Sequence, residues 1–102
     1  MKEITFINIS SNQLTEFPKI ICEWEELTFV NLNKNNISQI TSEIAALQKL
    51  QTLYLSDNQI TSLPTEISQL KNLSLLYLEN NPISESEKKR IRKLLPNCNV
   101  IF

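Results

Sequence analysis

The stretch that decides the fold is Leu53–Pro64, LYLSDNQITSLP, in which alternating leucines are followed by an asparagine, Asn58. An asparagine recurs at the same 23-residue spacing on both sides, as Asn12, Asn35 and Asn81. The apolar residues around each asparagine recur with it, so the chain is built from an internal repeat. A period of about 20 to 50 residues is typical of solenoids, in which each unit stacks on its neighbours.

Each unit reads LxxLxLxxNxLxxLPxxIxxLxx, with other apolar residues allowed at the leucine and isoleucine positions. Residues 4–26, 27–49 and 50–72 are full units, 73–83 are a partial fourth, and 84–102 differ from the pattern. All seven apolar positions are filled in each full unit. In the third they are Leu50, Leu53, Leu55, Ile60, Leu63, Ile67 and Leu70. We therefore expect one domain over residues 1–102.

The two halves of the unit predict different local structures. In the LxL segment the leucines alternate, so they share one face of a strand. In the second half the apolar residues are three to four positions apart, which suits a short helical or 3₁₀ turn. One unit cannot bury its apolar face alone, whereas stacked units can, with their strands paired in a parallel sheet.

This pattern resembles the leucine-rich repeat family. It is similar to the 23-residue class with Leu-Pro in the second half, found in bacterial leucine-rich repeat proteins and in eukaryotic Ras-signalling scaffolds. The resemblance implies a right-handed α/β solenoid with a parallel sheet on the concave side and short helical or 3₁₀ segments on the convex side. It implies binding of a peptide, protein or glycan without selecting among them, because one fold hosts many functions.

The four repeated asparagines, Asn12, Asn35, Asn58 and Asn81, are predicted to be structural. After each strand the chain turns sharply, and its backbone polar groups need partners. A buried carboxamide supplies both a donor and an acceptor, so it can bond its own turn and the neighbouring coil. The chain has no glycine, which fits a turn built by asparagine.

Residues 84–102 predict a capping helix followed by a fifth strand. Ser84 and Glu87 form a capping-box pattern, the basic run Lys88–Lys93 lies toward the helix C-terminus, and Pro96 ends the helix. LPNCNV (Leu95–Val100) then fits LxxLxL with Cys98 in the second leucine position, so Cys98 is expected to be buried. Helix-then-strand endings of this kind resemble the C-terminal caps of bacterial leucine-rich repeat proteins.

The residues that flank the inward leucines are predicted to line the concave face in three rows. The rows are Phe6, Phe29, Thr52 and Leu75; Asn8, Asn31, Tyr54 and Tyr77; and Ser10, Asn33, Ser56 and Glu79, with Asn97, Asn99 and Ile101 continuing them. Aromatic rings among small polar groups are typical of protein-recognition surfaces. We therefore expect a partner protein or peptide on this face, anchored by Phe29, Tyr54, Leu75 and Tyr77. The alternative is that these side chains only stack on one another.

No catalytic, metal or cofactor site is expected. The chain has no histidine, no glycine-rich loop and no Cys-x-x-Cys pair. A carboxylate pair such as Asp57 and Glu79 would lie on an open sheet that does not exclude water. Cys22 and Cys98 belong to the first and fifth coils, too far apart for the roughly 7 Å that a disulfide allows.

Composition and the first ten residues predict where in the cell the protein is found. No apolar run approaches the about 18 to 20 residues of a membrane span, and MKEITFINIS (residues 1–10) lacks the features of a signal peptide. A cytoplasmic protein, or a processed or excised piece of a longer one, is therefore expected. We also expect a monomer, with a dimer through the first edge strand as the alternative.

Two other interpretations stay open. The first unit begins almost at Met1 with an open edge strand, which fits a truncated chain or a frayed first coil better than a dimer through this edge. The alternative function is a structural or self-associating element that uses this edge. The basic run Lys88–Lys93 predicts either a solvated cap helix or a contact with an acidic partner. Because no aromatic residue interleaves with that run, nucleic-acid binding is not expected.

Overall fold

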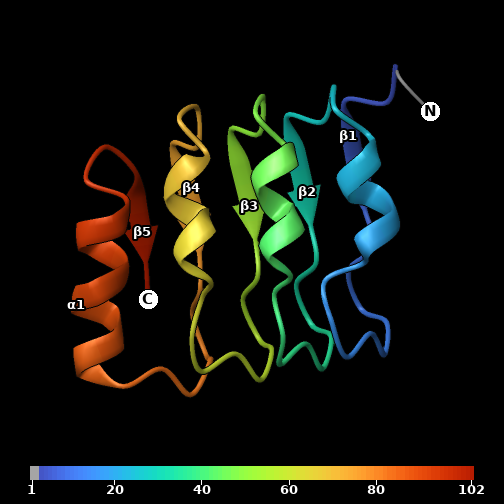
Figure 1. The fold of residues 1–102 in the computed structure, drawn as a ribbon. Helices are drawn as coiled ribbons and strands as arrows, with labels where there is room; N and C mark the ends of the chain where they lie inside the picture. The colour runs from blue at the N-terminus through green and yellow to red at the C-terminus, as the bar shows by residue number, and fades with distance from the viewer. Residues whose placement is uncertain (1–2) are drawn as a thin grey trace.

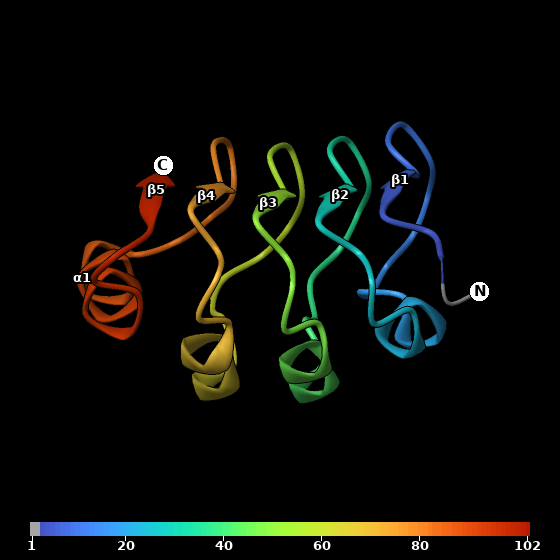
Figure 2. The same ribbon diagram turned by 90° about the horizontal axis from the view of Figure 1, so that it is seen from above.

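The computed structural model describes residues 3–102 as a stack of coils. Five parallel strands form one sheet in chain order (Figure 1): β1 (Phe6–Asn8), β2 (Phe29–Asn31), β3 (Thr52–Tyr54), β4 (Leu75–Tyr77) and β5 (Asn99–Ile101). Three 3₁₀ turns, η1 (Lys19–Glu23), η2 (Ser42–Ala46) and η3 (Thr65–Gln69), lie on the other side of the coils, and α1 (Glu85–Leu94) follows the last of them (Figure 2). The predicted solenoid with a capping helix is confirmed.

The core is a ladder of leucines and isoleucines between the sheet and the 3₁₀ turns. Val30, Leu53 and Leu76 are paired in register across β2, β3 and β4, and their side chains are completely buried. Ile21, Ile44 and Ile67 reach the same core from the opposite side, one from each 3₁₀ turn. Burying one such side chain contributes about 1.5 to 3 kcal/mol, and no coil can achieve this without its neighbours.

The asparagine ladder ties each coil to the one before it. Asn35, Asn58 and Asn81 each donate from Nδ2 to carbonyls of their own turn and to one carbonyl of the preceding coil. Each also accepts at Oδ1 from a backbone N–H of the preceding coil, at 3.0 to 3.1 Å. The predicted structural role of these three residues is confirmed.

Asn12 differs from the other members of the ladder. Its Nδ2 donates only to Ile9 and Ser10 of its own turn, and its side chain is exposed. The expectation of a buried carboxamide is therefore wrong at this position, because no earlier coil covers it within residues 3–102. Asn81 is half-buried.

The turns need a left-handed residue as well as an asparagine. The residue before each ladder asparagine has a positive φ: Ser11 at 59°, Lys34 at 61°, Asp57 at 61° and Asn80 at 59°. This conformation costs an ordinary L-residue about 1 kcal/mol or more, and glycine far less. The ladder therefore does not replace glycine: these four turns tolerate non-glycine residues in a strained conformation.

The capping helix is joined to the third coil by Glu87. Ser84 caps α1 as predicted, since its Oγ accepts from the Glu87 N–H at 3.2 Å. The Glu87 carboxylate accepts from the Leu63 N–H at 3.2 Å and from Arg90 at 2.7 Å. Glu87 thus bridges α1 and the solenoid.

In the described part of the chain no helix is long and apolar enough to cross a membrane.

The predicted register of the fifth strand is wrong by two residues. β5 pairs Val100 with Leu76, so Val100 holds the second leucine position, and Cys98 precedes the strand and is only half-buried. Asn97 also precedes the strand. Twenty-four positions separate Leu76 from Val100, against 23 between Leu53 and Leu76, because a ten-residue α-helix replaces the five-residue 3₁₀ turn.

Candidate binding face on the concave sheet

Four aromatic rings form one continuous stack across the sheet. Phe6 and Phe29 stack with ring centroids 4.4 Å apart and planes 11° from parallel. Tyr54 and Tyr77 stack in the same way, at 4.5 Å and 10°. Phe29 and Tyr54 join the two pairs at 5.2 Å with a 50° tilt. The stack therefore crosses from the row of Phe29 to the row of Tyr54, a step that sequence spacing did not predict.

Strand pairing aligns the first two rows on β1 to β4 as predicted, but Asn99 and Ile101 each lie one row earlier than predicted. Phe6, Phe29, Thr52 and Leu75 are in register across β1 to β4, and Asn99 extends their row on β5. Asn8, Asn31, Tyr54 and Tyr77 are likewise in register, and Ile101 extends theirs. Most of these side chains are half-buried, and Phe6 is 57% exposed. Both rows thus reach the surface of the sheet.

Side chains of the third row form hydrogen bonds within the protein. Asn33 Oδ1 accepts from the Ser56 N–H at 2.7 Å, and Ser56 Oγ donates to Glu79 Oε1 at 3.2 Å. Ser56 is buried, so its hydroxyl offers little surface to a partner. Ser10, Asn33 and Glu79 stay at least partly exposed.

The two amides of the second row are bound to the protein through their oxygens. Asn8 Oδ1 accepts from the Ser10 N–H, and Asn31 Oδ1 accepts from the Asn33 N–H, both at 3.0 Å. A backbone N–H can only donate, so the oxygen end of each amide is fixed at the turn. The Nδ2 groups of Asn8 and Asn31 are left without a hydrogen-bond partner within residues 3–102.

The two tyrosine hydroxyls lie next to each other at the β4 end of the stack. The pKa of Tyr77 is raised above its usual 10.0, first by desolvation, then by Tyr54 and by the Glu79 carboxylate. The Tyr77 hydroxyl therefore stays protonated, and able to donate, over the whole physiological range.

The acidic residues near the face are each bound elsewhere. Asp57 Oδ1 accepts from Asn80 Nδ2 at 2.8 Å, while Glu79 Oε1 accepts from Ser56. The carboxylate pair considered from the sequence is thus divided between two separate hydrogen bonds. The first two rows on β1 to β4 contain no charged residue. These rows can therefore recognise a ligand by its shape and by hydrogen bonds, and not by ion pairs.

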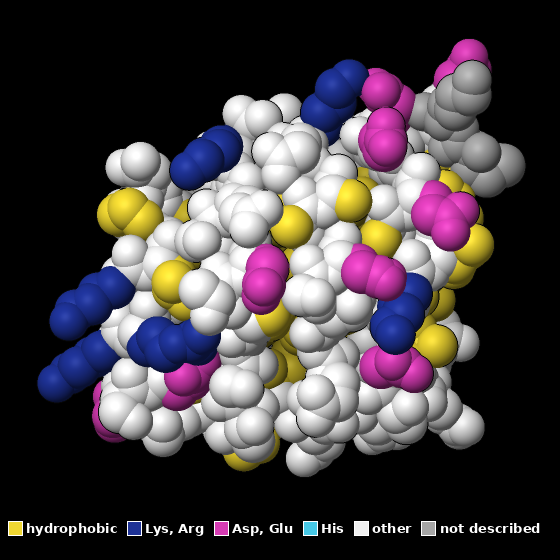
Figure 3. Space-filling model, in the orientation of Figure 1, with side chains coloured by type: hydrophobic (Ala, Val, Ile, Leu, Met, Phe, Trp, Pro, Cys, Tyr) yellow, Lys and Arg dark blue, Asp and Glu magenta, His cyan; other side chains and the backbone are white. Residues whose placement is uncertain are grey.

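The basic residues of α1 gather at one end of the molecule. Figure 3 shows them at its left edge, while acidic side chains are spread over the earlier coils. Arg92 and Lys88 lie over the Phe102 ring, at 4.6 and 5.5 Å from its centroid. Arg90 donates to the Leu63 carbonyl at 3.0 Å and to Thr65 at 3.1 Å. Three of the five basic side chains thus contribute to packing of the cap.

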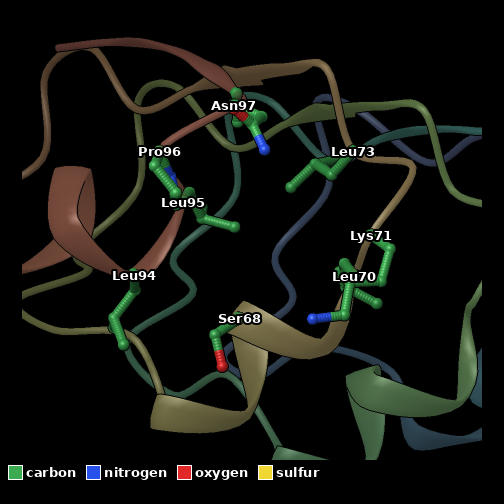
Figure 4. Close-up of a pocket in the computed structure, with 9 residues that line it drawn as sticks. Ser68, Leu70, Lys71, Leu73, Leu94, Leu95, Pro96 and Asn97 are labelled. Carbon is green, nitrogen blue, oxygen red and sulfur yellow. The ribbon is translucent and has the colours of Figure 1, made fainter.

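A cavity of about 240 Å³ lies between η3 and the end of α1. Leu73 and Leu95 point into it from opposite sides, and Ser68 and Asn97 lie at its margin (Figure 4). It forms where α1 stands in place of a fourth 3₁₀ turn. Sequence analysis missed this cavity, and the only signal for it was the change of period after Ile83.

Both cysteines are free thiols, as predicted. Burial raises the pKa of Cys22 to about 11, with smaller contributions from Glu43 and Glu23. Burial alone raises the pKa of Cys98 to about 11. Neither thiol is therefore activated as a nucleophile near neutral pH.

Comparison with known proteins agrees with the fold. A family profile described as a leucine-rich repeat region matches residues 7–95. No curated protein sequence gives a significant match.

Several solved structures are similar to this chain. A leucine-rich repeat protein of Leptospira interrogans superposes with a TM-score of 0.95 at 46% identity, over 98% of this chain and 26% of the other. An internalin of Listeria monocytogenes gives 0.78 at 26% identity, over 98% of this chain and 28% of its own. A second internalin shares the fold at 22% identity with a TM-score of 0.77, over 99% of this chain and 41% of its own.

The chain thus spans less than half the length of each of these proteins. The 23-residue coils, the asparagine ladder and the match over residues 7–95 all point the same way. This chain belongs to the leucine-rich repeat family, whose domains commonly serve as protein-interaction modules.

Proposed function

We propose that this domain binds a partner protein through the concave face of its sheet, without catalysing a reaction and without a cofactor. The observation that carries the proposal is the four-ring stack from Phe6 to Tyr77. Rings that served packing alone would be covered, whereas Phe6 is 57% exposed and the other three are partly exposed.

The chemistry of the face supports a protein ligand. Aromatic side chains are enriched at interface centres, while Lys, Glu and Asp are depleted there. The first two rows on β1 to β4 have four aromatic residues and no charged residue. The stack also pre-organises its rings, so little side-chain entropy is lost when a partner binds.

The test is capture from the source cell's lysate with wild type and a Phe29→Ser, Tyr54→Ser, Tyr77→Ser variant. Each protein is first checked for folding by circular dichroism. A matched control carries three substitutions on the convex side, Ile20→Ser, Glu43→Ser and Gln69→Ser, all at exposed positions.

A partner retained by wild type and the convex variant, and lost by the concave variant, is the expected result. Equal recovery on the folded concave variant contradicts the proposal, since it places the partner elsewhere on the molecule.

A further inference from the structure

Two neighbouring rows on the concave face differ in chemistry. We define the apolar row as Phe6, Phe29, Thr52 and Leu75, and the donor row as Asn8, Asn31, Tyr54 and Tyr77. Each row crosses four strands in register. Adjacent strands are about 4.8 Å apart, so each row extends about 14 Å along the solenoid.

The donor row offers mostly hydrogen-bond donors, although the Tyr54 and Tyr77 hydroxyls can also accept. The oxygens of Asn8 and Asn31 are held by the Ser10 and Asn33 N–H groups. Their Nδ2 groups are left for a ligand, and so is the Nδ2 of Asn33, whose oxygen accepts from the Ser56 N–H. The raised pKa of Tyr77 keeps its hydroxyl protonated.

The ring stack presents edges outward. Within each stacked pair, centroids 4.4 and 4.5 Å apart and planes within 11° of parallel bring one ring face against the other. What these rings offer to solvent is therefore mainly their hydrogen-bearing edges. The edge of an aromatic ring is the positive end of its quadrupole. Amide N–H groups and ring edges thus give the face a mainly positive partial charge, which complements electronegative acceptors.

From this complementarity we infer that the face takes an extended polypeptide segment that lies across the strands. Main-chain carbonyls of the segment accept from the donor row, and its apolar side chains contact the apolar row. About four residues of extended chain cover the 14 Å of the rows. The inference rests on the proposed function, and it specifies the chemical group that is recognised.

Glycans and nucleic acids fit this face less well. Sugar hydroxyls need polar partners along the whole ligand, yet in the apolar row the only polar side chain is that of Thr52. Single-stranded nucleic acids stack bases on open ring faces and need cations for their phosphates. Here inner ring faces are covered, and neither row contains Lys or Arg.

The experiment removes the donors without removing the rings or the turn bonds. Asn31→Asp keeps an oxygen for the Asn33 N–H and deletes the Nδ2 donor. Tyr54→Phe keeps the stacked ring and deletes the hydroxyl. Asn36→Asp adds the same charge at an exposed position outside both rows. Melting temperatures establish that each variant folds.

The probe is a peptide selected on the wild-type domain from a displayed library of random linear peptides, with binding measured by fluorescence anisotropy. An oligosaccharide array and single-stranded oligonucleotides are tested in parallel. We expect a peptide that the Phe29→Ser, Tyr54→Ser, Tyr77→Ser variant does not bind. The Asn31→Asp, Tyr54→Phe double variant should weaken its binding by about tenfold or more, since each lost hydrogen bond contributes a few-fold to tenfold. Asn36→Asp should leave it unchanged.

The other outcomes separate this inference from the proposed function. A peptide lost by the ring variant but bound normally by the folded double variant overturns donor recognition and leaves the concave face as the binding site. Glycan or oligonucleotide binding that needs the rings, with no peptide selected, overturns the polypeptide assignment. If no peptide, oligosaccharide or oligonucleotide depends on the rings, this inference fails, and the lysate capture decides the proposed function separately.

Discussion

Asn58 holds two neighbouring coils together with one side chain. Its Oδ1 accepts from the Ile37 N–H at 3.0 Å, and its Nδ2 donates to the Leu32 carbonyl at 3.1 Å, both in the preceding coil. The same Nδ2 group donates to Leu55 and Ser56 of its own turn, and the residue is 1% exposed. A partner for a buried backbone group is worth about 1 to 3 kcal/mol, so this asparagine is a main determinant of coil stacking.

Replacing Asn58 by alanine should lower the free energy of unfolding by about 3 kcal/mol or more, because several buried backbone groups lose their partner. Urea unfolding followed by circular dichroism measures this. Asn12→Ala is the matched control: its exposed side chain bonds only its own turn, and we expect about 1 kcal/mol or less. Equal losses in the two variants would show that bonds between coils do not set the effect.

Glycine at Lys34 should stabilise the domain. Lys34 has φ at 61°, which glycine adopts without the cost that a Cβ imposes. The gain is partly offset by the greater freedom of glycine in the unfolded chain, so we expect a net gain of up to about 1 kcal/mol. The melting temperature should rise for Lys34→Gly and fall for Lys34→Val. Lys71→Gly, at an exposed residue outside the positive-φ set, should lower it.

The two thiols should make the domain sensitive to alkali. Burial raises the pKa of Cys22 and Cys98 from 9.0 to about 11. The folded state therefore holds its thiol protons more tightly than the unfolded state between these values. By linkage, the stability associated with these thiols is fully present below pH 9 and is lost as the pH rises toward 11. Urea unfolding at several pH values measures the slope, and a Cys22→Ala, Cys98→Ala variant should reduce it.

The same pKa shift predicts slow thiol chemistry in the native protein. At pH 8 a thiol of pKa about 11 has roughly one hundredth of the thiolate of a thiol of pKa 9. Reaction with an aromatic disulfide reagent should therefore be slow in buffer and fast in denaturant. A rapid native reaction would contradict the assigned burial of the thiols.

Glu87→Ala should detach the capping helix more than Glu85→Ala. Glu87 accepts from the Leu63 N–H and from Arg90, so its loss leaves a backbone donor in the third coil unpaired, at about 1 to 3 kcal/mol. Glu85 has only the ion pair with Lys88 at 3.3 Å, and its side chain is 85% exposed. Such a pair contributes about 0 to 1 kcal/mol. Hydrogen exchange of α1 amides reports the difference directly, and similar exchange in both variants would contradict the bridging role of Glu87.

Much of the fold could be predicted because each strand and each 3₁₀ turn follows from the spacing of apolar residues close together in the sequence. The alternation around Leu53 and the spacing to Ile67 specify a strand and a 3₁₀ turn, and the 23-residue repeat stacks them in register. The prediction failed where the 23-residue period changes, at the fifth strand. The register at Cys98 is wrong by two residues, because α1 lengthens the last coil by one residue and the assignment of Cys98 made it one residue too short. Nothing local to LPNCNV records the length that the preceding helix adds.

The sequence by itself determined the coil period, the inward leucines, the interior asparagine ladder and the rows of the concave face, since each follows from residue spacing along the chain. Only the tertiary structure decided that the Phe29 ring packs against Tyr54, that the Asn31 oxygen accepts from the Asn33 N–H, and that Glu87 accepts from the Leu63 N–H. These relationships depend on which atoms of neighbouring coils, or of one turn, meet within hydrogen-bonding or van der Waals distance. That is a property of the packed solenoid, and no residue spacing encodes it.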